Sequence, residues 1–497
     1  MAGRKLKVLL VSAEVAPFAK VGGLADVAGA LPKALKALGH DVRVAMPCYK
    51  MIEDNPRYGV QDFLPPFPVP IHPGLTQTAW VRQTRIGEDV PVYLIANDTY
   101  FTDATESKKV YSGGPEPYVF FDRAVTEFVP RMDPAWVPDV VHCNDWHTGF
   151  VPVFLRHFHA DTPAWSRAAT VFTIHNLAYQ GEWDASLLAY AGLPESLFHY
   201  EKLEFYGKVS FMKGGLVYSD VVNTVSRTYA QEIQTPEYGC RLEGLLQDLQ
   251  RRGRLTGIVN GIDYEEYNPA TDPRIPAHFS AADPRGKAKC KAALQAESGL
   301  PRSKQAAVIG LISRLADQKG FDLIHAMAER MLELPVQFIV LGTGDERYET
   351  FFRELQSRYP KKVRANIGFD ANLAQRIYAG SDMFLMPSRF EPCGLGQLMS
   401  LRYGTIPIVR ATGGLADTIV DAGPRGTKGN GFVFTEYRAD ALLETVQRAV
   451  RVFGEPDKWS ALVVRALSAD FSWTSSARKY ADLYRQAAAV GREAAAA

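Results

Sequence analysis

Residues 7–45 read KVLLVSAEVAPFAKVGGLADVAGALPKALKALGHDVRVA, and this stretch carries the clearest fold signal in the chain. Its two ends, 7–11 and 41–45, are apolar runs that predict strands. Between them, apolar side chains recur at helical spacing, at Leu24, Val27, Ala28, Leu31, Leu35 and Leu38. Gly39 then stands where a helix C-cap glycine is expected. A strand, a helix and a second strand predict a βαβ unit with parallel strands.

The same alternation extends along the chain. In the first half, further strands are predicted at 140–142, 169–174 and 221–225, and the proline-rich region 49–118 predicts loops that run over the top of the domain. After a polar stretch, a second series of strands follows at 306–312, 336–341, 363–367, 383–386 and 406–409, separated by helices such as 323–332 and 373–379. We predict an α/β protein with two doubly wound domains, 1–257 and 258–472, and a final helix at 473–497.

The bulk composition excludes several classes of protein. With 497 residues, 46% of them apolar and 22% charged, the chain is expected to be globular and to hold two large domains. The 56 Lys and Arg residues nearly balance the 55 Asp and Glu residues, which argues against nucleic acid as the main partner. No run reaches the roughly 18 apolar residues of a membrane helix. Five scattered cysteines without a C-x-x-C pair predict a reducing, cytoplasmic location and no structural zinc.

The loop 387–397, PSRFEPCGLGQ, joins a predicted strand to a predicted helix. Glu391 therefore lies beside a helix N-terminus, where free N–H groups and the positive end of the helix dipole gather. A carboxylate beside an anion-binding helix start suits a ligand that is negative at one end and develops positive charge at the other, as a sugar diphosphate does. The alternative is that Glu391 caps its own helix, and the stretch alone favours neither.

A glycine pair occurs twice at a predicted helix start. Lys20 precedes Gly22-Gly23, and the sequence GGLAD of 22–26 returns at 413–417. Glycines at a helix start can form a phosphate cradle, and two such helix ends facing one cleft would neutralise a diphosphate without a metal ion. For Asp26 and Asp417, stabilisation of their own helix starts is the simpler prediction.

Other polar residues follow predicted strands directly. Ser313-Arg314-Leu315 and Lys319 come after the first strand of the second half, and they combine a rigid guanidinium fork with a mobile charge for two linked phosphates. In the first half, Asp145 and His175 lie at strand carboxyl ends, where open α/β sheets bind ligands. His142 and His147 are expected to be bonded within the fold. Their spacing matches no metal site, and we expect no metal.

Several motifs together resemble a known family, the bacterial glycogen synthases and plant starch synthases. They are KVGGLADV at 20–27, NDWH at 144–147, IHNLAYQG at 174–181, NGID at 260–263, SRL with KG at 313–320, RFEPCGL at 389–395 and TGGL at 412–415. The resemblance runs almost end to end. It implies two Rossmann-like domains with the active site in the cleft between them (the GT-B type), and a final helix that crosses back to the first domain.

The resemblance also implies an activity. A member of this family would transfer glucose from ADP-glucose to the non-reducing end of an α-1,4-glucan such as glycogen, with retention of configuration and without a cofactor or metal. The catalytic residues implied in this way are Asp145, His175, Arg314, Lys319 and Glu391. The implied substrate-binding residues are Lys20, Gly22, Gly23, Asp26, Trp146, Asn176, Asn260, Phe369, Cys393, Gly394, Leu395, Thr412, Gly413 and Gly414. Phe369 would lie against the adenine. Neither a membrane nor an oligomeric state is implied.

One position departs from the family pattern, and two alternative functions stay open. Gly396 stands where the family commonly has Thr or Asn, which removes one side-chain hydrogen bond to the phosphates. A related transferase or a nucleotide-sugar epimerase could use the same fold, and product analysis would separate these enzymes. A glucan-binding protein with a decayed site is the non-enzymatic alternative, but such a protein would not need all five predicted catalytic side chains.

Overall fold

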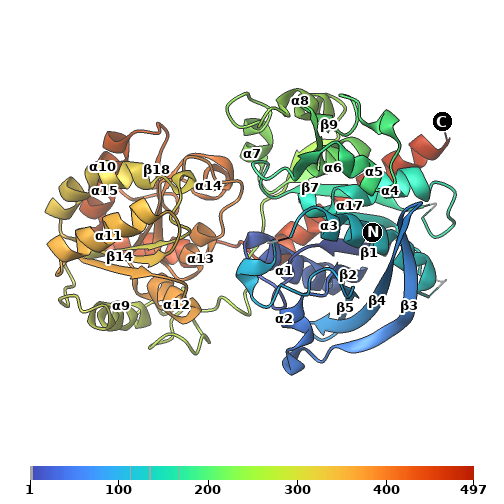
Figure 1. Ribbon diagram of the computed structural model, residues 1–497. Coiled ribbons are helices and arrows are strands. Elements are labelled where there is room, and N and C mark those ends of the chain that lie inside the picture. The colour runs from blue at the N-terminus through green and yellow to red at the C-terminus, as the bar shows by residue number, and fades with distance from the viewer. Residues whose placement is uncertain (1–3, 112, 134–135, 166, 497) are drawn as a thin grey trace. The chain divides into compact units, whose positions relative to one another are not determined.

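The computed structural model describes residues 4–111, 113–133, 136–165 and 167–496. Contacts between residues divide the chain into two compact units. The first unit comprises the described residues of Met1–Val225, Ala230–Asn260 and Trp473–Ala497, and the second comprises Ser226–Tyr229 and Gly261–Ser472. In Figure 1 the first unit runs from blue to green and ends in the red C-terminal helix, while the second runs from yellow-green to red-orange.

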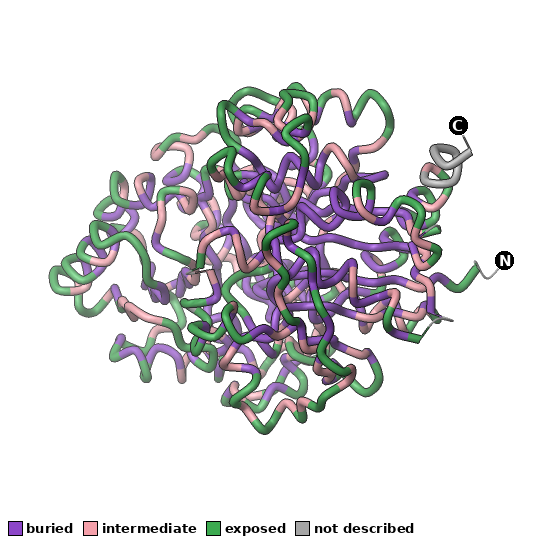
Figure 2. The backbone as a smooth tube through the Cα atoms, turned by 45° about the vertical axis from the view of Figure 1, so that its right-hand side comes forward, coloured by how far each residue is buried: buried purple, intermediate pink, exposed green. Residues whose placement is uncertain are grey.

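A large sheet forms the centre of the first unit. Its strands lie in the order β12-β11-β7-β6-β1-β2-β5-β4-β3. They are β1 (Lys7–Ser12), β2 (Asp41–Pro47), β3 (Gln61–His72), β4 (Leu75–Ile86), β5 (Val90–Ala96), β6 (Val140–Asn144), β7 (Ala169–Ile174), β11 (Val221–Thr224) and β12 (Leu255–Gly257). All neighbouring pairs from β12 to β5 are parallel, as the βαβ pattern predicts. The central strands β1, β6 and β7 are almost entirely buried, and Figure 2 shows such buried stretches in purple inside the tube and exposed stretches in green at its periphery.

The prediction of loops across 49–118 is wrong for much of that region. Strands β3, β4 and β5 lie there and extend the sheet, with β3 and β4 antiparallel to their neighbours. The proline-rich segment 64–68 lies within β3, whose register against β4 shifts between Leu64 and Phe67. Prolines cannot donate to a β ladder, but β3 is an edge strand, where a missing donor is tolerated. Proline density therefore indicated an edge strand and not a loop.

Helices and a small sheet complete the first unit. The helices are α1 (Gly23–Ala37), α2 (Lys50–Glu53), α3 (Glu116–Phe128), α4 (Phe150–Phe158), α5 (Ser186–Tyr190), α6 (Phe211–Tyr218), α8 (Glu243–Arg251) and α17 (Trp473–Ala496), and α7 (Arg227–Glu232) lies across the boundary of the units. The small sheet has the order β8-β10-β9 and consists of β8 (Glu182–Asp184), β9 (Glu204–Phe205) and β10 (Lys208–Ser210).

The C-terminal helix α17 packs against α1, β6, β7 and β11. A buried hydrogen-bond chain fixes it there, because the hydroxyl of Tyr484 donates to Nδ1 of His142 at 2.9 Å. Nε2 of His142 lies 2.6 Å from Oγ1 of Thr173. Burial lowers the pKa of His142 to about 3, so the ring is neutral. Both of its nitrogens form hydrogen bonds. The prediction that His142 is bonded within the fold is confirmed.

The second unit is built on a six-stranded parallel sheet with the order β15-β14-β13-β16-β17-β18. Its strands are β13 (Ala307–Ile312), β14 (Val336–Gly342), β15 (Val363–Ile367), β16 (Met383–Met386), β17 (Ile406–Arg410) and β18 (Phe432–Phe434). Its helices are α9 (Gly286–Glu297), α10 (Phe321–Glu333), α11 (Glu346–Arg358), α12 (Ala371–Gly380), α13 (Gly396–Arg402), α14 (Gly413–Thr418), α15 (Ala439–Phe453) and α16 (Pro456–Leu467).

Each large sheet contains one point where the strand order reverses. In the first unit this topological switch point lies between β1 and β6, and in the second it lies between β13 and β16. Ligands of open α/β sheets bind at the carboxyl ends of the strands beside such a point. Within the described part of the chain, none of the helices has the length and apolar content needed to cross a membrane.

We predict that Tyr484→Phe weakens the docking of α17. The change leaves the buried Nδ1 of His142 without its donor, which is expected to cost about 1–3 kcal/mol. Urea unfolding combined with amide hydrogen exchange of α17 measures the effect. Tyr206→Phe is the matched control, because Tyr206 is 67% exposed in the same unit. Equal stability of the two variants would contradict the role assigned to the Tyr484 hydroxyl.

Candidate active site

The loops at the switch point of the second unit carry the predicted charged residues. Arg314 follows β13, and Lys319 ends a short 3-10 helix, Asp317–Lys319, in the same loop. Glu391 lies in the loop after β16. Since β13 and β16 are neighbours in the sheet, both loops start from adjacent strand ends. The fold thus gathers residues that are more than 70 positions apart in the sequence.

Lys319 and Glu391 form a buried ion pair. Nζ of Lys319 donates to both carboxylate oxygens of Glu391, at 2.9 and 2.7 Å, and Oγ of Ser388 donates to Oε2 at 2.9 Å. Glu391 is only 5% exposed. Its carboxylate therefore binds a neighbouring loop, and the alternative that it caps its own helix is wrong.

A glycine allows the two loops to approach each other. Gly320 has φ of 73°, and a Cβ there would lie 2.0 Å from the carbonyl oxygen of Pro387. The amide of Arg389 also donates to the carbonyl of Gln318 at 2.8 Å. This contact between the two backbones holds Lys319 next to Glu391. The position of the pair is therefore set by the packing of the two loops as well as by the side-chain hydrogen bonds.

The second glycine pair supports the Glu391 loop from the other side. A Cβ at Gly413 would lie 2.0 Å from the Glu391 carbonyl oxygen, and one at Gly414 would lie 2.0 Å from that of Cys393. The amide of Gly414 donates to the carbonyls of Glu391 and Pro392 at 3.1 and 3.2 Å. The prediction that this amide donates to a diphosphate conflicts with these bonds. Thr412 is the fully buried N-cap residue of α14.

The residues after Glu391 lead into α13. Gly394 has φ of 71°, and Nε2 of Gln397 donates to the carbonyls of Cys393 and Gly394 at 3.0 and 2.9 Å. Cys393 is buried, and Leu395 is the N-cap residue of the helix. A Cβ at Gly396 would lie 3.0 Å from the ring of Phe384. The departure from the family pattern at 396 therefore coincides with tight packing against β16.

Phe369 is 88% exposed directly after Gly368, at the carboxyl end of β15. An apolar ring of this size that remains accessible offers a stacking surface for a planar group. Its position at the carboxyl edge of the same sheet as Arg314 fits the predicted contact with a nucleotide base.

The two aspartates of the repeated GGLAD motif bind different partners. Oδ1 of Asp26 accepts from Nζ of Lys20 at 2.6 Å. The carboxylate of Asp417 accepts from the backbone N–H of Arg227 at 2.6 Å and from Oγ1 of Thr228 at 2.7 Å, and thereby caps α7. Asp26 also lies in the first turn of α1, where a negative charge stabilises the helix start as predicted. For Asp417 the prediction is wrong, because its carboxylate bonds the start of α7 and α14 has no acidic residue in its first turn.

At the switch point of the first unit, the side chain of Glu14 is hydrogen-bonded to the glycine loop, the loop that contains Gly22 and Gly23. Its Oε2 accepts from the amides of Val21 and Gly22 at 2.6 and 2.9 Å, and the hydroxyl of Tyr111 donates to its Oε1. Glu14 is 3% exposed. The Gly22 amide, predicted to cradle phosphate, is thus engaged by a protein carboxylate. A Cβ at Gly22 would meet no atom within 4 Å, so this glycine leaves open space beside the backbone.

Asp145 follows β6 in an unusual backbone conformation, with φ of 62°. Such strain is typical of functional sites. Its Oδ1 accepts from the backbone amide of His175 at 3.1 Å. Burial raises the pKa of Asp145 to about 7, while hydrogen bonds from the His175 and Asn176 amides oppose this rise and the Glu14 charge adds to it. The carboxylate therefore titrates near neutral pH.

His175 lies beside Asp145 at the end of β7. Its Nε2 is 3.0 Å from Oδ1 of Asn144, whose amide group donates to the carbonyls of Val11 and His142. Nε2 therefore carries the proton, and Nδ1 is an acceptor. Burial lowers the pKa of His175 to about 3, so the ring is neutral. Asn176 closes the turn, since its Oδ1 accepts from the amide of Ala178 at 3.1 Å.

An aromatic cluster surrounds the same strand ends. The ring of His147 stacks on Tyr111 with centroids 4.4 Å apart, and lies 3.9 Å from the ring of Trp146. His147 is buried, but its Nδ1 has no hydrogen-bond partner among the described residues, so the prediction of a fully bonded histidine is wrong for this nitrogen. Asn260 is also buried, with an unpartnered Oδ1 in the described structure. The Asn260 oxygen can accept a hydrogen bond from a ligand, and the His147 nitrogen can accept or donate one according to the tautomer of its ring.

The sequence predictions missed Glu14, Tyr111 and Ser388. Glu14 follows β1 by two residues, so the rule that identified Asp145 and His175 at strand ends could have found it. Tyr111 and Ser388 were not identifiable in this way, because their roles depend on contacts with Glu14 and Glu391. In the part of the chain that the structure describes, no group of three or more His, Cys, Asp or Glu side chains is arranged to hold a metal ion.

Comparisons with known proteins agree with this geometry. Residues 7–248 match the family described as the starch synthase catalytic domain, and residues 296–460 match glycosyl transferases group 1. The chain is 51% identical to the glycogen synthase of Desulforudis audaxviator over 98% of this chain and 97% of that protein. It is 49% identical to the glycogen synthase of Thermotoga petrophila over 98% and 100% of the two chains.

A solved structure gives the same result. The catalytic domain of starch synthase IV from Arabidopsis thaliana, bound to ADP and acarbose, superimposes with a TM-score of 0.90 at 34% identity, covering 98% of this chain and 100% of that one. The two α/β units with polar strand ends define a glycosyltransferase of the GT-B fold. Within that class, the chain belongs to the family of bacterial glycogen synthases and starch synthases.

We predict that Asp145→Asn flattens the pH dependence of stability. Burial raises the pKa of Asp145 from 3.8 to about 7, so between these values the folded state binds more protons than the unfolded chain. Stability contributed by this group therefore falls as pH rises from about 4 to 7, by up to about 1.4 kcal/mol per pH unit. Urea unfolding at several pH values measures the difference between wild type and variant. Parallel curves would contradict the raised pKa.

We also predict that Glu14→Gln loosens the glycine loop. The N–H groups of Val21 and Gly22 share Oε2, and a glutamine oxygen in its place carries no charge, so both hydrogen bonds weaken, by about 1 kcal/mol in total. Amide hydrogen exchange of residues 19–24 should accelerate. Glu88→Gln, at an exposed position of the same unit, serves as the control. Unchanged exchange in the Glu14 variant would show that the loop does not depend on this carboxylate.

Proposed function

We propose that this enzyme transfers glucose from ADP-glucose to the non-reducing end of an α-1,4-glucan, with retention of configuration and release of ADP. The observation that carries the proposal is the buried Lys319–Glu391 pair at the β13–β16 switch point, in the same strand-end loops as Arg314. This arrangement places fixed positive charge beside a carboxylate where an α/β sheet binds its ligand.

The second unit would bind the nucleotide end of the donor. Arg314 offers a bidentate fork and Lys319 a point charge for the two phosphates, and exposed Phe369 offers a stacking surface for adenine. ADP is supported by the solved starch synthase IV structure, which is bound to ADP. Thr412, Gly413, Gly414 and the residues around Gly394 would act by shaping the Glu391 loop and α13.

The first unit would bind the glucosyl group and the acceptor. Asp145, Trp146, His175, Asn176 and Asn260 lie at or after its strand ends, and they offer the acceptors and donors that sugar hydroxyls need. Open space at Gly22 lets a ligand approach the backbone, while Lys20 is held by Asp26 at the same loop. Glu391 and Cys393 would contribute from the second unit.

The chemistry follows from these charges. The bond between the anomeric carbon and the β-phosphate oxygen breaks, and a new bond forms from that carbon to the acceptor O4 on the same face. Arg314 and Lys319 stabilise the negative charge that develops on the phosphate, which then takes the acceptor's proton. Glu391 is not assigned as a nucleophile, because both its oxygens accept hydrogen bonds from Lys319. Its role is to hold Lys319 and to offset positive charge at the sugar.

We propose that the reaction needs no metal or other cofactor, because cationic side chains can neutralise the diphosphate directly. We further propose a cytoplasmic location. Its support is that the five cysteines, at 48, 143, 240, 290 and 393, are all free thiols, as is usual in a reducing compartment.

We predict that Arg314→Ala and Lys319→Ala each lower kcat/KM for glucosyl transfer by about 10²–10³-fold, because each removes a donor to developing charge. A coupled assay of ADP release with glycogen as acceptor measures the loss, and Lys361→Ala, at an exposed position of the same unit, is the matched control. Near-normal turnover in either variant would refute the diphosphate assignment.

The same assay tests the function itself. Wild-type enzyme should release ADP and lengthen glycogen with ADP-glucose, and should work less well with UDP-glucose. Product analysis distinguishes this result from the alternative of an epimerase, which would isomerise the sugar nucleotide and leave the glucan unchanged. Absence of glucan elongation with either donor would overturn the proposal.

A further inference from the structure

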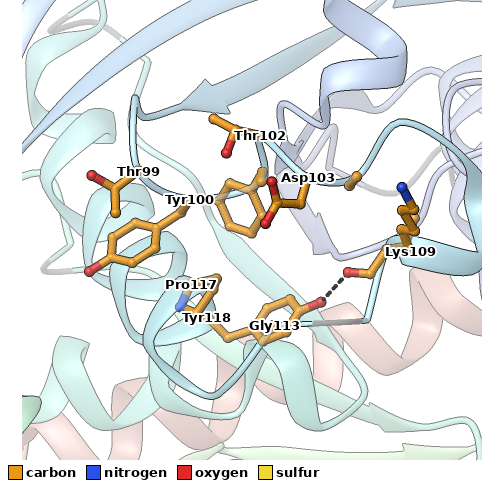
Figure 3. Close-up of a pocket in the computed structure, with 11 residues that line it drawn as sticks. Thr99, Tyr100, Thr102, Asp103, Lys109, Gly113, Pro117 and Tyr118 are labelled. Atoms are coloured by element: carbon orange, nitrogen blue, oxygen red, sulfur yellow. Dashed lines mark hydrogen bonds between the residues drawn. The ribbon is translucent and has the colours of Figure 1, made fainter.

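Two clusters of aromatic side chains lie beside predicted site residues. The first lines a hollow of about 130 Å³ in the loops after β5, and Figure 3 shows Tyr118 across this hollow from Thr102 and Asp103. The ring centroid of Tyr118 also lies 5.1 Å from that of Trp146, so the hollow belongs to the site already described. The second cluster surrounds Tyr437, a half-buried residue of the second unit that follows β18.

Two guanidinium groups contact the ring of Tyr437. Cζ of Arg389 lies 4.4 Å from the ring centroid, and Cζ of Arg410 lies 5.4 Å from it. A cation over an aromatic face is attracted by the ring quadrupole. Arg389 lies in the loop after β16, and Arg410 is the last residue of β17. Tyr437 therefore joins the carboxyl ends of three neighbouring strands, β16, β17 and β18.

An outer ion pair joins the same two chain segments as the Lys319–Glu391 pair. It consists of Arg389 and Asp322, with Nη2 and Oδ2 3.2 Å apart. Arg389 precedes Glu391 by two residues, and Asp322 follows Lys319 by three. The side chains of the outer pair are 51% and 40% exposed, so water weakens the attraction between them.

Tyr437 contacts both partners of the outer pair. Its hydroxyl donates to Oδ1 of Asp322 at 2.5 Å, and its ring lies against Arg389. Burial and the bond to Asp322 raise the pKa of Tyr437, so the hydroxyl stays protonated and remains the donor. One half-buried side chain thus holds two charges that would otherwise be mobile in solvent.

The backbone next to Glu391 is held from two sides. Nη1 of Arg410 donates to the carbonyl of Arg389 at 2.5 Å. On the other side, the carbonyl of Gln318 accepts from the amide of Arg389 at 2.8 Å, and Nε2 of Gln318 donates to the carbonyl of Phe390 at 3.3 Å. Movement of either guanidinium group would therefore shift the backbone that carries the Glu391 carboxylate.

We propose that Tyr437 is a positioning residue for glucosyl transfer. Through Arg389, Arg410 and Asp322 it fixes the place of the Lys319–Glu391 pair, and it needs no contact with the substrate in this role. The inference rests on the proposed function, in which Lys319 stabilises charge on the leaving phosphate. Because that charge is greatest as the bond breaks, the placement of Lys319 affects the rate more than donor binding.

Steady-state kinetics test this role. In Tyr437→Leu, kcat with ADP-glucose and glycogen should fall about tenfold, because a small shift of a catalytic group lowers the rate steeply. The KM for ADP-glucose should stay unchanged. Tyr437→Phe keeps the ring on both arginines and loses only the hydroxyl, so it should retain most of the rate that the leucine variant loses.

Tyr359→Leu is the matched control for the kinetics. Tyr359 is also a half-buried tyrosine of the second unit with an arginine over its ring, but it lies before β15, at the amino end of that strand. An unchanged kcat in Tyr437→Leu would overturn the proposal. So would an equal fall in Tyr359→Leu, or a rise in the KM for ADP-glucose without a change in kcat.

A double-mutant cycle tests the route through Arg389. The combined variant Tyr437→Leu and Arg389→Gln should lose no more kcat than the more impaired of the two single variants, because both changes remove the same support. Losses of kcat that multiply would show that the two residues act independently, which would contradict the proposal.

Amide hydrogen exchange separates this inference from the proposed function. In Tyr437→Leu, exchange should accelerate in residues 313–320 and 387–397 and stay unchanged in β15, whereas Tyr359→Leu should leave both of those loops unchanged. Acceleration in the two loops would support the positioning role even in an enzyme that failed to elongate glucans. Unchanged exchange in an enzyme that does elongate glycogen would refute this role and leave the proposed function intact.

Discussion

The ion pair between Lys319 and Glu391 is the interaction on which the second unit's site depends. Both side chains are largely buried, so each charge is stabilised mainly by the other, and removing one partner would leave an uncompensated buried charge. The pair also joins the loops after β13 and β16, which the Gly320 turn brings into contact. A cation is thereby held at the switch point in a fixed position, which is the condition for stabilising charge that develops on a leaving phosphate.

In the first unit a buried carboxylate also fixes a loop at the switch point, but its partners are backbone amides and not a lysine. Glu14 accepts hydrogen bonds from the Val21 and Gly22 amides, so a carboxylate at a strand end fixes the glycine loop much as Glu391 fixes Lys319. Its negative charge also contributes to the raised pKa of Asp145. Preorganisation of the loop and adjustment of a neighbouring acid therefore come from the same buried group.

Much of the fold was predictable from the sequence, because the spacing of apolar residues and the positions of glycines at helix ends identify strands and helices locally. The strands of 7–45 and of the second unit follow that pattern closely, whereas β3, β4 and β5 were missed. For β3 the reason is that its prolines are tolerated only at a sheet edge, and edge position is not a local property. In the site, strand-end residues such as Asp145 and Arg314 were predictable. The partnership of Lys319 with Glu391 was not, because it joins residues 72 positions apart.

The repeated GGLAD motif shows that identical short sequences can have different roles in the two units. A Cβ at Gly22 would meet nothing within 4 Å, whereas one at the equivalent Gly413 would lie 2.0 Å from the carbonyl oxygen of Glu391. The first glycine leaves space that a ligand can enter, and the second permits close packing of the protein on itself. The two copies differ by one residue in helix position, since α1 begins at Gly23 and α14 begins at Gly413, and they differ in the surrounding loops. Close approach of a substrate to the backbone is therefore expected at Gly22, and mechanical support of Glu391 at Gly413 and Gly414.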